Sequence, residues 1–255
     1  MTIHRFKKKC FIVTGAADGI GLATTERLIR EGASVAMLDL SEDKLLSAAE
    51  KFGEHAQAFT VDIASEEKIK QTFATAIEWL GELNGVVNAA GIVDFGHSHE
   101  YPLERWQRVI DVVLTGTFIV NKTAIPYLLK TNGAVVNVAS IGGLRGKAWQ
   151  AAYSAAKGGV LNLTRALACE YVGRIRFNTV APGQVNNNIA MNSQIQVPPD
   201  GISDEEFLSE YGKRVMAPKG GGDSDDIAGV ITFLLSDDAA YMEGSTVVVD
   251  GATIA

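Results

Sequence analysis

The sequence has very little cysteine and no long apolar run. Its 255 residues include only 2 cysteines, which excludes a disulfide framework. Cys10 and Cys169 each lie in an apolar segment, so we expect both to be small buried side chains. No apolar run approaches the roughly 20 residues of a membrane span, and the run after Lys9 is too short for a signal-peptide core. We therefore expect a protein of a reducing compartment, most simply the cytoplasm.

Basic residues are also in the minority. The chain has 23 Lys and Arg against 30 Asp and Glu, which gives a formal net charge of -7. An acidic balance argues against nucleic acid or an anionic membrane surface as the main partner. Hydrophobic residues make up 47% of the chain, an ordinary share for a globular protein with a substantial core.

Strand-like and helical patterns alternate along most of the chain. Helical patterns such as 20–32 and 65–81 separate the apolar runs. This alternation predicts βαβ units and a parallel sheet that is covered on both faces, in one α/β domain over residues 1–255. The seven runs that read as strands are 10–14, 34–40, 56–63, 83–91, 134–140, 176–183 and 245–251.

One stretch, residues 186–224, breaks this alternation. Pro198-Pro199 and the glycines at 220–222 are turn or loop signals. A long insertion within a compact α/β domain is usually functional. We favour a substrate lid over the alternative of a surface excursion.

A glycine-rich turn joins the first strand to the first helix. Gly15, Gly19 and Gly21 have the spacing Gly-x-x-x-Gly-x-Gly, with Asp18 and Ile20 between them. Glycines let the backbone approach a pyrophosphate, to which the following helix presents free N–H groups and its positive dipole end. Glycines also serve ordinary turns, but a turn directly after the first strand favours nucleotide binding.

An acidic residue ends the second strand. Asp39, followed by Leu40, lies where a carboxylate can accept hydrogen bonds from an adenosine ribose. The same carboxylate would repel the 2′-phosphate of NADP, and the glycine turn has no Lys or Arg to offset it. NAD is therefore the expected cofactor. The alternative is that Asp39 only caps a turn.

Polar and small residues follow the next two strands. Asp62 and Ile63 come after the third strand, and Asn88, Ala89 and Gly91 come after the fourth. Ligands of open α/β sheets bind outside the carboxyl ends of the strands, so we expect these residues at a cofactor cleft. Each polar residue could instead form a local Asx turn.

A tyrosine and a lysine four residues apart lie in a helical pattern. Tyr153 and Lys157 should therefore share one helix face. A tyrosine is a weak base at neutral pH, but a nearby ammonium group favours its phenolate. Ser140 closes the fifth strand-like run and could donate a hydrogen bond to a substrate oxygen. Together these groups could exchange a proton with an alcohol or ketone.

These motifs together resemble the short-chain dehydrogenase/reductase family. The similarity covers nearly the whole chain. Its motifs are Thr14-Gly15-x-x-x-Gly19-Ile20-Gly21, Asn88-Ala89-Ala90-Gly91, Ser140, Tyr153-x-x-x-Lys157 and Pro182-Gly183. The resemblance implies a single Rossmann-type, doubly wound parallel sheet of about seven strands. It also implies an NAD(P)-dependent oxidoreductase of small molecules that forms a homo-oligomer, a tetramer or a dimer.

The resemblance also implies a role for each residue. Tyr153 would be the general acid/base, Ser140 would orient the substrate oxygen, and Lys157 would stabilise the phenolate and hold the nicotinamide ribose. Cofactor contacts would come from Gly15, Asp18, Gly19, Ile20, Gly21, Asp39, Leu40, Asp62, Ile63, Asn88, Ala89, Gly91, Tyr153, Lys157, Pro182, Gly183 and Val185.

The chain departs from the family pattern at two positions. Val113 stands where the family usually has an asparagine that helps to relay protons from the lysine to solvent, so the relay must differ here. Asn187 stands where a threonine is common, and its amide can still form a hydrogen bond.

The substrate is less determined by the sequence. We expect the segment after Gly91, residues 141–150 and the 186–224 stretch to form the pocket walls. Apolar residues such as Ile189, Met191 and Trp149 indicate an uncharged, partly apolar alcohol or ketone, unless they only pack the lid. A metal site at His97 and His99 is not expected, because no third ligand is in view.

Two other functions stay open at this point. One is a 3-oxoacyl-carrier-protein reductase, which would favour NADPH and a basic docking patch. Asp39 and the acidic balance argue against it. The other is a catalytically idle NAD-binding regulatory protein, which Val113 suggests and which Ser140, Tyr153 and Lys157 argue against.

Overall fold

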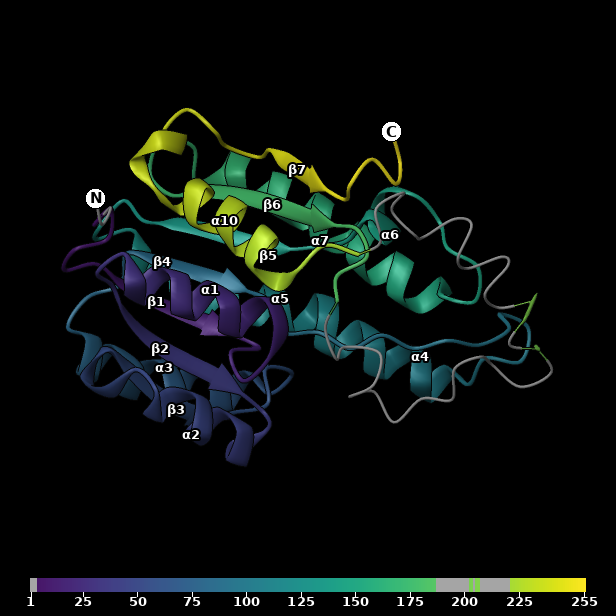
Figure 1. Ribbon diagram of the computed structural model, residues 1–255, viewed down its shortest axis with the longest axis horizontal. Helices are drawn as coiled ribbons and strands as arrows, with labels where there is room; N and C mark the ends of the chain where they lie inside the picture. Colours follow the sequence, from purple (N-terminus) through teal and green to yellow (C-terminus); the bar gives the residue numbers. More distant parts are fainter. Residues whose placement is uncertain (1–3, 187–201, 204, 207–220) are drawn as a thin grey trace.

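The seven apolar runs form one parallel sheet, as the sequence predicts. The computed structural model describes residues 4–186, 202–203, 205–206 and 221–255. The strand order is β3-β2-β1-β4-β5-β6-β7, and every neighbouring pair is parallel. The strands are β1 (Cys10–Thr14), β2 (Ser34–Asp39), β3 (Ala56–Thr60), β4 (Gly85–Asn88), β5 (Ala134–Val138), β6 (Arg176–Pro182) and β7 (Thr246–Val249). Their carboxyl ends point to the side on which α4 and α6 lie (Figure 1).

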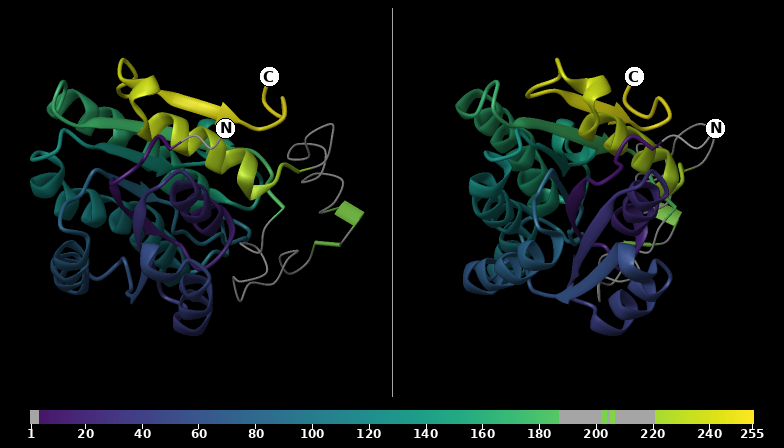
Figure 2. Two further views of the ribbon diagram at one scale, coloured as in Figure 1. Left: turned by 60° about the vertical axis from the view of Figure 1, so that its left-hand side comes forward. Right: turned by 90° about the vertical axis from the view of Figure 1, so that its left-hand side faces the viewer.

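Helices cover both faces of this sheet, so the doubly wound prediction is confirmed. Two views of the sheet show α1 and α10 on one side and a second helix layer on the other (Figure 2). The longer helices are α1 (Gly19–Arg30), α2 (Glu42–Glu50), α3 (Glu66–Leu80), α4 (Leu103–Ile110), α5 (Gly116–Leu128), α7 (Ala151–Glu170) and α10 (Ser224–Leu235). Short helical turns are α6 (Ile141–Leu144), Gly53–His55 and Asp237–Ala239.

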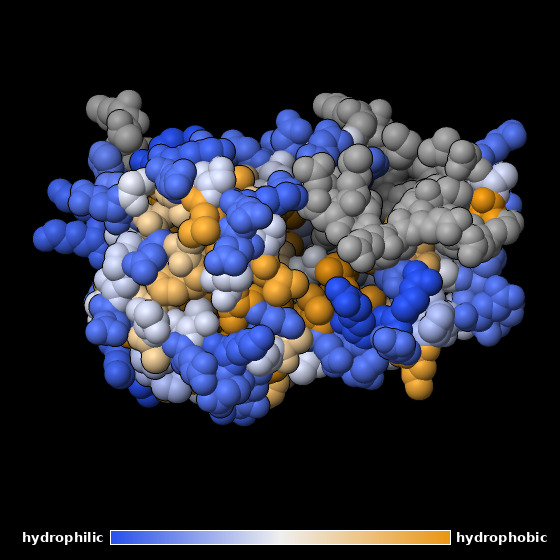
Figure 3. All heavy atoms as spheres, turned by 90° about the horizontal axis from the view of Figure 1, so that it is seen from below, coloured by the Kyte–Doolittle hydropathy of each residue, from blue (hydrophilic) through white to orange (hydrophobic). Residues whose placement is uncertain are grey.

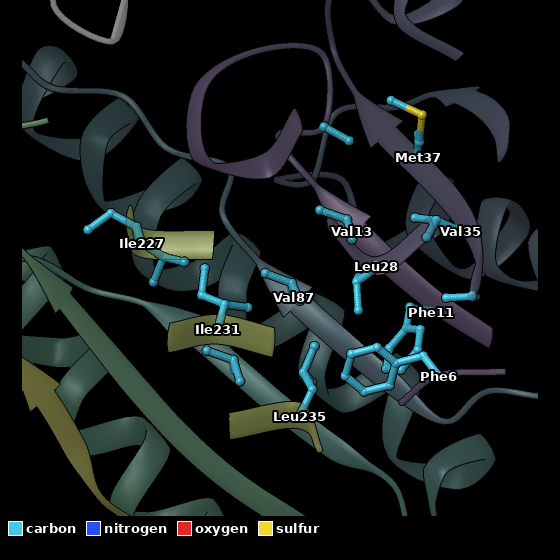
Figure 4. Packing of buried hydrophobic residues seen from close by; sticks show 14 of the residues in the cluster. Phe6, Phe11, Val13, Leu28, Val35, Met37, Val87, Ile227, Ile231 and Leu235 are labelled. Atoms are coloured by element: carbon cyan, nitrogen blue, oxygen red, sulfur yellow. The ribbon is translucent and has the colours of Figure 1, made fainter. Parts of the chain in front are cut away.

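The core alternates between the two faces residue by residue. In β1, Phe11 and Val13 pack with α1 and α10, whereas Ile12 packs against the layer that contains α3 and α5. Figure 4 shows Phe11 and Val13 on the same side as Leu28 of α1 and Ile231 of α10. Full burial of a side chain such as Phe11 contributes about 1.5–3 kcal/mol. The double coverage explains why the strands read as continuously apolar.

Helices α4 and α5 form one long helix, which the sequence did not predict. A π-helical turn, Asp111–Thr115, joins them without a break. By length and composition the resulting helix, Leu103–Leu128, could cross a membrane, with 44% of its apolar window buried in the protein. Its buried residues pack against α3 and the sheet, and Lys122 pairs with Glu66 of α3 at 2.9 Å. These contacts hold one face of the helix against the core of the protein.

One other expectation is wrong, and another lies mostly outside the described residues. Cys10 is buried in β1, but Cys169 lies on the exposed side of α7, so the expectation of a buried Cys169 is wrong. The apolar pattern around Cys169 belongs to the opposite face of that helix. Most of the expected lid, 186–224, falls outside the described residues, as does Asn187. Ile202 is described, and it is buried in the apolar cluster that contains Tyr153.

Candidate active site

A cleft of about 640 Å³ lies at the carboxyl ends of the strands. In Figure 3, hydrophobic atoms gather in the middle of one face between hydrophilic regions. Sixteen of the seventeen sequence-predicted cofactor residues line the cleft, as does Ser140. The sixteen are Gly15, Asp18, Gly19, Ile20, Gly21, Asp39, Leu40, Asp62, Ile63, Ala89, Gly91, Tyr153, Lys157, Pro182, Gly183 and Val185.

The glycine turn is shaped so that only glycine fits at two of its positions. Gly15 has φ +67°, and a Cβ there would lie 2.8 Å from the Cα of Ala90. A Cβ on Gly21 would overlap the carbonyl oxygen of Gly15. Asp18 caps helix α1 by accepting a hydrogen bond from the Gly19 N–H at 2.7 Å. The turn and the helix start thus form the kind of backbone cradle that fits a pyrophosphate.

Asp39 links the glycine turn to the end of β2. Its Oδ2 accepts a hydrogen bond from the Ala17 N–H at 3.1 Å, and its Oδ1 accepts one from the Ser41 N–H at 2.9 Å. The carboxylate therefore caps a turn as well as lining the cleft. Each oxygen keeps a second lone pair for a ribose hydroxyl. The sequence reasoning missed Lys44, which also lines the cleft and lies 3.8 Å from Asp18.

Asn88 differs from its predicted place. It is buried behind the cleft and is not among the residues that line it. Its Nδ2 donates to the Oδ1 atoms of Asn121 and Asn137, both at 2.8 Å. Asn137 in turn donates to Thr164 Oγ1 at 2.9 Å. This amide cluster joins β4, α5, β5 and α7, so Asn88 acts on the cleft through the strands that it fixes.

Tyr153 and Lys157 share the inner face of α7, as their spacing predicts. Both side chains are buried, and the Lys157 ammonium lies 5.7 Å from the centre of the Tyr153 ring. Lys157 Nζ also donates to the Val138 carbonyl oxygen at 2.7 Å. Burial lowers the pKa of Lys157 to about 8. Desolvation of the charged ammonium therefore costs folding free energy. The ammonium lies next to the phenol whose ionised form it would stabilise.

Ser140 reaches the same point from the end of β5. It caps α6, and its Oγ accepts a hydrogen bond from the Gly142 N–H at 3.0 Å. That bond fixes the oxygen and leaves the hydroxyl proton to point at a substrate oxygen. Helix α6 crosses α7 closely at Gly143, where an added Cβ would lie 2.6 Å from the Lys157 carbonyl carbon. The missing side chain thus lets Ser140 approach the Tyr153 and Lys157 pair.

This crossing yields a prediction. Gly143→Ala should force α6 away from α7 and lower kcat/KM by about tenfold or more, because small misplacements of catalytic groups are costly. Gly146→Ala is the matched control, since a Cβ on Gly146 meets nothing within 4 Å. Steady-state kinetics of both variants, with thermal melts to check folding, make the comparison. Equal activity of the two variants would contradict this role of the crossing.

Val113 forms an apolar wall beside the lysine. It is fully buried in the π-helical turn. A Cβ on Gly91 would lie 3.6 Å from Lys157 Nζ and 3.8 Å from Val113 Cγ2, so the two side chains border the same small space. Valine offers no hydrogen bond there, and the Val113 carbonyl oxygen already accepts one from Thr117 Oγ1 at 2.8 Å.

The sequence reasoning missed the polar residues at the catalytic end of the cleft. Arg108, Lys147 and Gln150 line it, whereas Trp149, an expected wall residue, does not. The expected wall segment 141–150 does line the cleft, but with the polar side chains of Lys147 and Gln150 in addition to Ser140 beside it. Trp149 has φ +60°, a conformation rare for a bulky residue, and its carbonyl oxygen accepts a hydrogen bond from the Gly96 N–H.

The described residues contain no group of three or more His, Cys, Asp or Glu side chains that could hold a metal ion. His97 and His99 do lie together, with ring centres 5.7 Å apart. His99 contacts the neighbouring Glu100 at 3.5 Å. Neither histidine lines the cleft.

The chain is similar to known oxidoreductases over nearly its whole length. Residues 15–252 match a family model described as Enoyl-(Acyl carrier protein) reductase. The chain is 36% identical to 2-(S)-hydroxypropyl-CoM dehydrogenase 3 of Xanthobacter autotrophicus, over 99% of each chain. It is 38% identical to the inactive 2-(S)-hydroxypropyl-CoM dehydrogenase 2 of that organism, over 89% of this chain and 97% of the relative. The crystal structure of levodione reductase matches with a TM-score of 0.86 at 30% identity, over 97% of this chain and 98% of that one.

Proposed function

Because the chain belongs to the short-chain dehydrogenase/reductase family, we propose that it is an NAD(H)-dependent oxidoreductase that interconverts a secondary alcohol and a ketone. Tyr153 is its general acid/base. The observation that carries this proposal is the convergence of Ser140, Tyr153 and Lys157 on one cleft whose other end is a glycine turn. The turn, Asp39 and the start of α1 fit a dinucleotide, which when bound supplies hydride transfer.

The protein's own groups handle the proton. Ser140 donates a hydrogen bond to the substrate oxygen and holds it beside the Tyr153 hydroxyl. In the oxidising direction, Tyr153 as phenolate takes the hydroxyl proton, and in reduction the phenol returns it. The Lys157 ammonium stabilises the phenolate, and its bond to Val138 O keeps it in place. The buried setting strengthens this charge interaction relative to water.

The cofactor preference rests on Asp39. Asp39→Asn removes the charge that would repel a 2′-phosphate, so the ratio of kcat/KM with NAD to that with NADP should fall by about tenfold or more. Asp43→Asn is the control, because it makes the same charge change on α2 outside the cleft. The ratio is measured with one alcohol and both cofactors. An unchanged ratio, or wild-type preference for NADP, would overturn the assignment of NAD.

Val113 tests the proton relay. Val113→Asn adds a hydrogen-bonding group beside Lys157, so it should preserve or raise kcat. Val113→Leu, which adds bulk but no polar group, separates polarity from packing. The readout is kcat across pH, together with a melt to verify folding. A large fall in kcat for well-folded Val113→Asn would show that the valine has a role of its own.

One experiment decides among the candidate functions. Purified protein is mixed with NAD and a panel of secondary alcohols, and NADH formation is followed by absorbance. Turnover supports the proposal. A clear NADPH preference with 3-oxoacyl carrier-protein substrates would favour the alternative of a 3-oxoacyl-carrier-protein reductase, the activity for which a 32% identical relative from Thermotoga maritima is named. Dinucleotide binding without any turnover would favour an idle protein, for which the inactive relative gives a precedent.

We also propose a homo-oligomer, a tetramer or dimer, in a reducing compartment such as the cytoplasm. The long helix Leu103–Leu128 supports assembly, because less than half of its apolar window is buried and Phe118 on it is 44% exposed. The unpaired Cys10 and Cys169 suit a reducing compartment. Light scattering after gel filtration gives the mass, and a monomer would contradict the assembly.

A further inference from the structure

The carboxylates that line the cleft all lie at its adenosine end, since Asp18 and Asp62 follow β1 and β3 and Asp39 is the last residue of β2. Lys44 of α2 lines this end too, and it lies 3.8 Å from Asp18. Beyond β4, the charged residues among the described lining are all cations. They are Arg108 on α4, Lys147 between α6 and α7, and Lys157 on α7. The mechanism uses Lys157 and leaves the other two cations without a role.

Lys147 lies beside the reacting groups. A Cβ on Gly142 would be 3.4 Å from Ser140 Oγ and 3.6 Å from Lys147 Cδ and Cε, so the lysine stem packs over the same glycine as the catalytic serine. The side chain is half-buried. Burial, with a smaller contribution from the Arg145 charge, lowers the pKa of Lys147 to about 8. A lysine in a cleft whose pKa is lowered by burial is typical of a functional site.

The phosphates of a bound dinucleotide would lie too far away to be the anion that Lys147 binds. Its pyrophosphate belongs at the glycine turn after β1, whereas Lys147 follows β5, two strands further along the sheet. Two strand spacings are about 10 Å. Arg108 lies on the same side, and it makes no ion pair with any of the residues that the structure describes. The positive charge at this end therefore faces the substrate.

We propose that Lys147 is a specificity-determining residue, and that the substrate is a secondary alcohol or ketone carrying an anionic group that the Lys147 ammonium binds. A carboxylate or a sulfonate has the required chemistry. Arg108 adds to the attraction at the same end of the cleft. The inference rests on the proposed function, and it departs from the uncharged substrate that the sequence suggested.

The test compares hydroxy carboxylates and hydroxy sulfonates of graded chain length, each with its neutral methyl ester. For the wild type, kcat/KM with NAD should favour the best anion over its ester by about 10- to 100-fold. Lys147→Met should lower the value for the anion to that for the ester and leave the ester within about threefold. Lys68→Met, on the exposed side of α3, removes an equal charge outside the cleft and should change neither value. A melt of each variant verifies folding.

Two outcomes overturn the inference. One is equal use of anion and ester by the wild type, and the other is an equal loss for both in Lys147→Met, which would indicate a structural role. Oxidation of neutral alcohols without any preference for anions would leave the proposed function standing. If no compound turns over, calorimetric binding of a saturated carboxylate and its ester to the protein with NADH decides. Lys147-dependent preference for the carboxylate would then support an anion-binding site at Lys147, although the proposed function fails.

Discussion

Tyr153→Phe is expected to lower kcat by about 10²- to 10⁴-fold, the usual contribution of a general acid/base. The substitution removes one oxygen atom from a side chain that lies in a buried apolar cluster with Ala156 and Val160. The ring keeps its packing, so stability and NAD affinity should change little. The loss therefore isolates the proton transfer from the structure of the cleft.

Tyr241→Phe is the matched control for this experiment. Tyr241 is fully exposed and remote from the cleft lining, so the same atom is removed without consequence. Both variants are compared with wild type by steady-state kinetics and by titration with NAD. Retention of more than about a tenth of wild-type kcat by Tyr153→Phe would contradict its assignment as the general acid/base.

Lys157→Met should inactivate the protein and stabilise it at the same time. The pKa of Lys157 is about 8 in the folded protein against 10.5 for an unperturbed lysine. At neutral pH this difference corresponds to about 3 kcal/mol of destabilisation from the buried ammonium. Methionine avoids this cost but loses the hydrogen bond to Val138 O, worth about 1 kcal/mol. A net gain of about 2 kcal/mol should raise the melting temperature by roughly 4 to 8 °C.

The pH dependence gives the sign of this effect. Below pH 8 the Lys157 ammonium is present in both the folded and the unfolded chain, so the full destabilisation from burying the charge applies. Between about 8 and 10.5 the folded chain has lost the proton and the unfolded chain keeps it, so this group makes stability rise with pH. Lys147, whose pKa is also lowered to about 8, contributes a similar rise. In Lys157→Met the rise should therefore fall to about half, while Lys68→Met should retain it in full. Urea unfolding at a series of pH values measures the difference. A destabilised Lys157→Met with the wild-type slope would contradict the account.

The strands and the fold class were predictable because their signal is local. Continuous apolar runs such as Phe11–Val13 occur where both faces of a strand are buried, and the structure buries these residues on both faces. The errors lie at the carboxyl ends. Residues such as Asp62, Ser140 and Gly183 were read as strand, but they follow β3, β5 and β6. The candidate site lies at these carboxyl ends. There the backbone leaves the hydrogen-bonded pairing of the sheet and turns toward the cleft.

The rest of the site depends on contacts that no local pattern reveals. Lys147 reads as an ordinary surface lysine until α6 folds back onto α7 at Gly143. Asn88 reads as a cleft residue, and only the meeting of β4 with α5 and β5 shows its partners Asn121 and Asn137. The unbroken helix Leu103–Leu128 was also hidden, because a π-helical turn carries it through Asp111.

Hydride transfer from a secondary alcohol is the central claim, and isotope transfer tests it most directly. A secondary alcohol with deuterium on its carbinol carbon is incubated with NAD and the wild-type protein, and the nicotinamide product is analysed by NMR. The account predicts that deuterium appears at C4 of NADH with one stereochemistry, and that Tyr153→Phe transfers it far more slowly. NAD that binds but acquires no deuterium from any alcohol in the panel would contradict it.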